Sequence, residues 1–126
     1  MKTWQNEIPF CRENPITEAL FPENAVFFDI ETTGFSAKHT QVYLIGCAAR
    51  KGNVICTTQF FAENSLDEKL ILNAFSELLT HYDILITFNG VGFDIPYLQG
   101  SYHYHSLMEP FENFEYLDIY KSLSKY

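Results

Sequence analysis

Two acidic residues interrupt an otherwise apolar stretch in the first third of the chain. Residues 26–35 read VFFDIETTGF, and their β-branched and aromatic side chains predict a strand. Side chains alternate between the two faces of a strand. Asp29 and Glu31 therefore point to one face, about 7 Å apart, while Val26 and Ile30 point to the other. Because two such carboxylates repel each other and resist burial, something must compensate their charge.

The remaining segments predict an α/β fold. Strands are expected at 25–31, 42–50, 53–62, 83–89 and 115–120, and helices at 65–82, in the segment that contains Pro96, and from residue 121. Short links between the first three strands favour antiparallel pairing, and a right-handed crossover through the first helix makes the fourth strand parallel to the first. This predicts a mixed five-stranded sheet in the order 3-2-1-4-5, with its second strand antiparallel and helices on its faces.

The chain divides into an N-terminal arm, residues 1–24, and one domain, residues 25–126. The arm contains three prolines, and a short helix is expected at 16–20. In the domain, Ser65 and Glu68 have the spacing of a capping box at the start of the first helix. The apolar stripe that follows them is expected to be core.

Composition narrows the classes of function. The formal net charge is −8 and there is no basic run, so a polyanionic ligand would need metal ions or another part of a larger protein to supply positive charge. No apolar run is long enough for a membrane span, and no secretory signal is evident. Cys11, Cys47 and Cys56 lack zinc-site spacing and are expected to be reduced thiols, which favours a cytoplasmic location.

The predicted topology brings a third carboxylate to the first two. Parallel first and fourth strands place Asp94, which follows the fourth strand, beside Asp29 and Glu31, where open α/β sheets bind ligands. Oxygen ligands suit Mg²⁺ or Mn²⁺, and two such ions about 3.5–4 Å apart can promote phosphodiester hydrolysis. The alternative is structural: strand-end carboxylates facing solvent, and Asp94 as a helix N-cap.

Two segments resemble the motifs of a known family. FFDIETTGF and ITFNGVGFDIPYL resemble the first two motifs of the DEDD 3′–5′ exonuclease superfamily, which has the ribonuclease H-like fold. The resemblance covers roughly residues 25–120 and is closest to YprB-type ribonuclease H-like domains, then to proofreading domains of B-family DNA polymerases.

The resemblance implies a metal-dependent 3′–5′ exonuclease that acts on single-stranded DNA or RNA ends. Its catalytic metal ligands would be Asp29, Glu31 and Asp94, at a two-metal site for Mg²⁺ or Mn²⁺. The pocket for the terminal nucleotide would be lined by Thr32, Thr33, Phe35, Asn89 and Phe93. Phe35 would stack on the terminal base, although a core position is an equal alternative for Phe35 and Phe93.

The chain departs from the family at the third motif, which supplies a fourth carboxylate. Asp118 matches a different family residue, the Asp at the start of the next strand. His39, His103 and His105 are expected in surface loops, and the alternation of His103 and His105 suggests an extended segment. The expectation is a C-terminally truncated domain that binds only one ion and turns over slowly. Uncovered apolar surface would favour a homo-oligomer. The alternative function is a catalytically inactive ribonuclease H-like binding or oligomerisation module.

Overall fold

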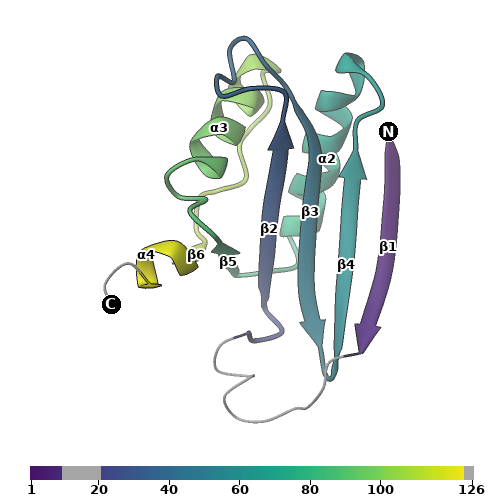
Figure 1. Ribbon diagram of the computed structural model, residues 1–126, viewed down its shortest axis with the longest axis vertical. Coiled ribbons are helices and arrows are strands. Elements are labelled where there is room, and N and C mark those ends of the chain that lie inside the picture. The colour runs from purple at the N-terminus through teal and green to yellow at the C-terminus, as the bar shows by residue number, and fades with distance from the viewer. Residues whose placement is uncertain (10–20, 124–126) are drawn as a thin grey trace.

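The protein forms one mixed sheet with helices packed against it (Figure 1). The computed structural model describes residues 1–9 and 21–123. The strands are β1 (Lys2–Pro9), β2 (Ala25–Thr32), β3 (Val42–Lys51), β4 (Val54–Phe61), β5 (Ile84–Thr87) and β6 (Glu115–Asp118). The helices are the short 3-10 turn η1 (Ser65–Asp67), α2 (Glu68–Leu79), α3 (Asp94–Tyr104) and α4 (Ile119–Leu123).

The order of the strands is β1-β4-β3-β2-β5-β6, which contains the predicted order of five. β2 pairs antiparallel with β3, and β3 pairs antiparallel with β4. β5 pairs parallel with both β2 and β6. The crossover through α2 therefore brings the carboxyl ends of β2 and β5 to the same edge of the sheet, as expected, and the α/β class is confirmed.

The sheet has one strand more than predicted, because residues 2–9 of the expected arm form the edge strand β1. β1 pairs antiparallel with β4, with Trp4 opposite Gln59. All eight of its residues are exposed, so the segment lacks the apolar alternation that marks a half-buried strand. The helix expected at 16–20 lies outside the described residues.

The first helix begins differently from the predicted capping box. Asn64 Oδ1, not the side chain of Ser65, accepts a hydrogen bond from the Leu66 N–H at 3.0 Å. Glu68 is buried, and its carboxylate accepts the Val42 N–H at 2.7 Å and pairs with His105 Nε2 at 2.7 Å. The Glu68 side chain therefore joins α2 to β3 and to the end of α3.

Of the three histidines expected in surface loops, one lies in a helix and one is half-buried in the turn after it. α3 continues through Tyr104, so His103 is in its last turn rather than in an extended segment. His105 follows the helix and is half-buried against Glu68. His39 is exposed in the loop after β2, as expected. Pro96 lies in the first turn of α3, where the missing N–H costs no helical hydrogen bond.

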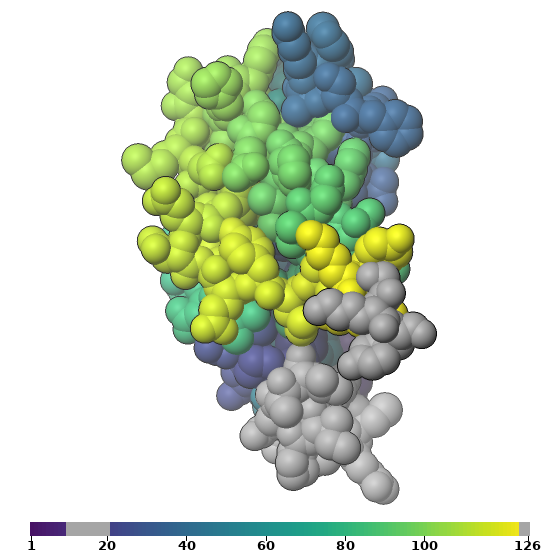
Figure 2. Space-filling model, turned by 90° about the vertical axis from the view of Figure 1, so that its left-hand side faces the viewer, coloured from purple at the N-terminus to yellow at the C-terminus, as the bar shows by residue number. Residues whose placement is uncertain are grey.

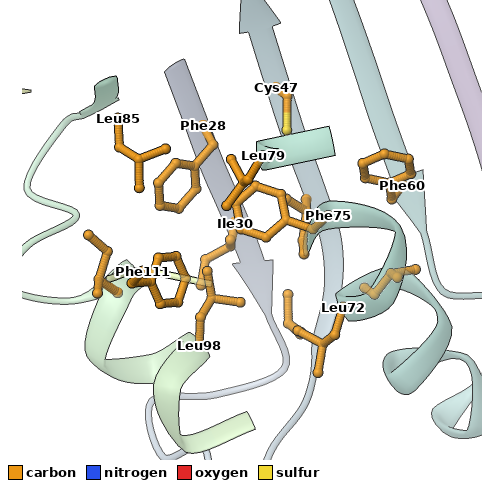
Figure 3. Packing of buried hydrophobic residues seen from close by; sticks show 14 of the residues in the cluster. Phe28, Ile30, Cys47, Phe60, Leu72, Phe75, Leu79, Leu85, Leu98 and Phe111 are labelled. Atoms are coloured by element: carbon orange, nitrogen blue, oxygen red, sulfur yellow. The ribbon is translucent and has the colours of Figure 1, made fainter. Parts of the chain in front are cut away.

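The core lies between the sheet and the helices α2 and α3 (Figure 3). Phe28 and Ile30 of β2 point to this side, and the ring centroid of Phe28 lies 5.1 Å from that of Phe75 in α2. Cys47 of β3 is a free, buried thiol whose pKa is raised to about 12 by burial. Burial of such side chains, at about 25 cal/mol per Å² of apolar surface, holds the helices on this face.

The opposite face of β1–β4 carries no helix in the described part of the chain and faces the viewer in Figure 1. The alternation of side chains places Phe27, Leu44 and Phe61 on this face, and Trp4 packs on Phe61 with ring centroids 5.7 Å apart. We call this the open face. No helix among residues 1–9 and 21–123 has the length and apolar character to cross a membrane.

Candidate active site

Asp29 and Glu31 lie on the open face near the end of β2. Asp29 stands opposite Gly46 of β3, where an added Cβ would meet no atom within 4 Å. The Ile30 N–H donates to Asp29 Oδ1 at 3.0 Å. Both carboxylates are exposed and line one shallow pocket of about 320 Å³. A ligand therefore has room beside them.

The loop between β5 and α3 places Asp94 at the edge of the sheet where β2 and β5 end. Asn89 has a left-handed backbone, with φ of 58°. A Cβ at Gly90 would lie 2.5 Å from Thr87 Cβ, so the close approach of this loop to β5 requires glycine. The Ile95 N–H then donates to the Gly90 carbonyl at 2.7 Å, which starts α3 with Asp94 as its first residue.

The carboxyl groups of Asp94 and Asp29 meet at this edge. Asp94 is buried, and burial, followed by hydrogen bonding to Asp29 and the charge of Asp29, raises the pKa of Asp94 to about 7. The Ile30 N–H opposes this shift. Two carboxyl groups in contact without a cation share a proton or repel. A divalent ion with a preference for oxygen ligands would compensate their charge, so this pair fits Mg²⁺ or Mn²⁺.

A third ligand does not join this pair. Among the residues that the structure describes, no three His, Cys, Asp or Glu side chains are grouped closely enough to hold a metal ion. Glu31 shares the open-face pocket with Asp29, whereas the carboxylates whose charge raises the pKa of Asp94 are Asp29 and Asp118. Its role as a metal ligand stays a prediction.

An aromatic pocket is formed by the first turn of α3 and the loop after β2. Phe35 is 93% exposed, which excludes the core position considered for it, and Phe93 is half-buried with its ring centroid 5.8 Å from that of Tyr97. The pocket has a volume of about 270 Å³ and is lined by Phe35, Ala37, Gly92, Phe93, Pro96 and Tyr97. A planar, partly apolar ligand would fit against these rings.

The two threonines of the first motif shape the loop after β2. Thr32 Oγ1 donates to the Gly34 carbonyl at 2.6 Å. Thr33 Oγ1 accepts the Gln41 N–H at 2.9 Å. Each hydroxyl group thus makes a hydrogen bond within the loop, while Asn89 is exposed at the start of the neighbouring loop.

Tyr97 is a residue of this region that sequence reasoning did not single out. Its hydroxyl lies 2.7 Å from Thr40 Oγ1, which ties α3 to the loop after β2. A Cβ at Gly100 would lie 2.8 Å from the Ala37 Cβ, so α3 and this loop are in close contact. Figure 2 shows the loop, in blue, beside α3, in green. The only signal in the sequence is the position of Tyr97 within the DIPYL segment.

Asp118, at the end of β6, is buried, and its carboxylate accepts four backbone N–H groups. Asp118 Oδ1 accepts the N–H groups of Asn89 at 2.8 Å, Tyr120 at 3.1 Å and Lys121 at 3.5 Å. Asp118 Oδ2 accepts the Val91 N–H at 3.2 Å. Burial opposes its charge, but these four donors together lower the pKa of Asp118.

Comparison with solved structures finds the same fold in nucleic-acid enzymes. The family B DNA polymerase of the archaeon Pyrobaculum calidifontis matches with a TM-score of 0.69 and 16% identity, over 81% of this chain and 16% of that one. Metal-free and zinc-bound forms of the E. coli ExoI–ssDNA complex match with TM-scores of 0.53 and 0.57 and identities of 13% and 16%. Each of these two matches covers 79% of this chain and 28% of that chain.

The sequence comparisons place the chain in a family. No curated protein matches it. A family model described as the RNase H superfamily matches residues 26–126, which include β2 from its second residue and all of β3, β4, β5 and β6. The ribonuclease H-like resemblance inferred from the two motifs is thereby confirmed. With its mixed sheet and the meeting of β2 and α3 at one edge, this chain belongs to the RNase H superfamily.

Proposed function

We propose that this chain is a metal-dependent 3′–5′ exonuclease domain that hydrolyses phosphodiester bonds at the ends of single-stranded nucleic acid. The observation that carries the proposal is the meeting of the Asp29 and Asp94 carboxyl groups beside an exposed aromatic pocket. The likeness to an ExoI–ssDNA complex supports a single-stranded substrate. The chain spans only 16% to 28% of the matched structures, so the activity of those whole proteins is part of the proposal.

Asp29 and Asp94 are proposed to hold the divalent ion, with Glu31 as a further ligand from the open face. When bound, such ions activate a water molecule and stabilise the charge on the leaving oxygen. The contribution of the protein is to fix the two carboxylates on separate rigid elements, β2 and α3. The raised pKa of Asp94 means that ion binding displaces a proton near neutral pH.

Phe35 and Phe93 are proposed to bind the terminal nucleotide. Stacking of a base on an exposed aromatic ring is worth about 1–3 kcal/mol and does not depend on the identity of the base. The backbone of the loop after β2, shaped by Thr32 and Thr33, would form one side of this pocket, and Asn89 would form the other. With a net charge of −8, the chain needs the ion to attract the phosphate backbone.

The second candidate function is a catalytically inactive ribonuclease H-like module that binds nucleic acid or a protein. Two observations favour it. The described residues gather only two carboxyl groups at the site rather than three, and the open face leaves Trp4 and Ile8 about half exposed. A binding module would retain affinity for a single strand without shortening it.

Degradation of a single strand labelled at its 5′ end distinguishes the two candidates. With Mn²⁺ present, the proposed function predicts a ladder of products shortened from the 3′ end, abolished in Asp29→Asn and Asp94→Asn. Asp83→Asn is the matched control, since Asp83 is exposed and its carboxylate accepts the Asn24 amide at 3.3 Å. Binding without any shortening by the wild-type chain would instead support the inactive module.

A further inference from the structure

We propose that Asp118 is a positioning residue, which holds the loop between β5 and α3 so that Asp94 is presented to the metal ion. This inference rests on the proposed function of the site. It concerns a side chain that does not touch the ion itself. The argument depends on the hydrogen bonds of Asp118 and on the path of the loop that they hold.

Asp118 joins two segments that are far apart in the sequence. Its carboxylate accepts the N–H groups of Asn89 and Val91 in the loop, and those of Tyr120 and Lys121 in α4. Three of these donors converge on Oδ1 and the fourth, the Val91 N–H, is accepted by Oδ2. Asp118 therefore holds backbone N–H groups of both the loop and α4.

The loop that Asp118 holds continues into the first turn of α3, which begins at Asp94. The Phe93 N–H donates to the Asn89 carbonyl at 3.2 Å, and the Ile95 N–H donates to the Gly90 carbonyl at 2.7 Å. The Gly90 carbonyl belongs to the same peptide unit as the Val91 N–H that Asp118 binds, and the Asn89 carbonyl belongs to the residue whose own N–H Asp118 binds. Moving Asn89 or Val91 away from Asp118 would move the first turn of α3.

A second contact joins the same two segments. The ring of Phe88, directly after β5, meets the ring of Tyr120 in α4 edge to face, with centroids 5.6 Å apart. Asn89 also has the left-handed backbone that non-glycine residues rarely adopt, so the loop conformation needs support from its surroundings. The carboxylate of Asp118 provides that support in the form of charge-assisted hydrogen bonds.

The test compares Mn²⁺ affinity, measured by calorimetry, among Asp118→Asn, Asp118→Ala and the wild-type chain. Asparagine retains one oxygen for Asn89 and Tyr120 but turns an amide toward the Val91 N–H, so it keeps part of the contact. Both variants remove the charge of Asp118, which acts on Asp94 through space, so the positioning role is measured by the difference between the two variants. We expect Mn²⁺ affinity to fall about tenfold in Asp118→Asn and further in Asp118→Ala, and equal losses in the two variants would overturn the positioning role. Ile71→Val, a buried change in α2, is the control: it lowers the melting temperature but leaves Mn²⁺ affinity unchanged.

The outcomes separate this inference from the proposed function. If Asp118→Asn and Asp118→Ala bind Mn²⁺ within twofold of the wild-type chain while Asp94→Asn does not bind it, the positioning role is overturned and the proposed site stands. If Asp94→Asn binds Mn²⁺ as well as the wild type, the proposed site itself fails.

A measurement on the wild-type chain covers the case in which the Asp118 variants do not fold. The amide protons of Asn89 and Val91 are expected to exchange slowly, and more slowly when Mn²⁺ is added, because the ion fixes Asp94 and hence the loop. Exchange of both amides as fast as in an exposed loop, with and without Mn²⁺, would overturn the positioning role.

Discussion

The carboxyl group of Asp94, in the first turn of α3, lies within hydrogen-bonding reach of the carboxylate of Asp29 near the end of β2. No cation among the described residues is placed between them, and the pKa of Asp94 is raised to about 7, mainly by burial and then by Asp29. Full ionisation of the pair without a metal ion therefore destabilises the folded protein, and this destabilisation can be measured.

The first prediction concerns the stability of the metal-free protein. Since the folded-state pKa of Asp94 lies above its unfolded value of 3.8, its contribution to stability is present below pH 4 and is lost as pH rises through 7. Asp94→Asn removes this loss and should stabilise the protein at pH 8 by on the order of 1 kcal/mol, allowing for partial access of water to the site. The stabilisation by Asp94→Asn should be smaller at pH 5 than at pH 8.

Urea denaturation at pH 5 and pH 8, in the presence of a chelator, measures this difference. Asp83→Asn removes an exposed charge at the other end of the sheet and should give no such dependence on pH. An equal effect of Asp94→Asn at both pH values would contradict the environment assigned to Asp94.

The second prediction concerns Phe35. Because its side chain is 93% exposed, Phe35→Ala should change the free energy of unfolding by less than about 0.5 kcal/mol. It should weaken binding of a single strand by about 1–3 kcal/mol. Fluorescence anisotropy with a strand that has a phosphorothioate 3′ end, which resists cleavage, measures binding. Met108→Ala, at a position 92% exposed and outside the pocket, should leave binding unchanged, and an equal loss in both variants would exclude stacking.

The third prediction concerns the Tyr97–Thr40 contact, whose oxygens are 2.7 Å apart. Tyr97→Phe keeps the ring in the pocket and removes only the hydroxyl, so the free energy of unfolding should fall by about 0.5–1.5 kcal/mol. The loop after β2 should also exchange its amide protons faster. Tyr104→Phe, at an exposed position of the same helix, should change neither quantity. Unchanged loop exchange in Tyr97→Phe would mean that this contact does not hold the loop.

The fourth prediction concerns Glu68, which is buried and accepts hydrogen bonds from the Val42 N–H and from His105. Glu68→Ala leaves the Val42 N–H without its partner and should destabilise the protein by about 1–3 kcal/mol. Glu77→Ala, at an exposed position of the same helix, should have little effect. Thermal unfolding of the two variants makes the comparison, and similar melting temperatures would contradict the bridging role of Glu68.

The central part of the fold could be predicted from the sequence because its signals are local and consistent. The alternation around Asp29 and the stripe of α2 fix which faces are buried, and short links leave few possible strand orders. β1 could not be predicted, since every residue in it is exposed and the pairing with β4 determines its structure.

The site was predictable only in part, for a related reason. The topology predicts that Asp29 and Asp94 meet, because Asp29 lies near the carboxyl end of one strand and Asp94 follows the carboxyl end of the parallel strand beside it. The roles of Tyr97, Glu68 and Asp118 depend on hydrogen bonds to backbone and side chains distant in the sequence, which no spacing reveals. The capping box predicted from Ser65 and Glu68 was wrong for the same reason, because the Glu68 carboxylate accepts the Val42 N–H instead.

Calorimetric titration of the wild-type chain with Mn²⁺, repeated with Asp29→Asn and Asp94→Asn, tests the central claim most directly. We expect the wild type to bind Mn²⁺ with release of a proton near pH 7, and both variants to lose this binding, while Asp83→Asn retains it. Binding of equal strength in the wild type and in both site variants would contradict the claim that the paired carboxyl groups of Asp29 and Asp94 hold the ion.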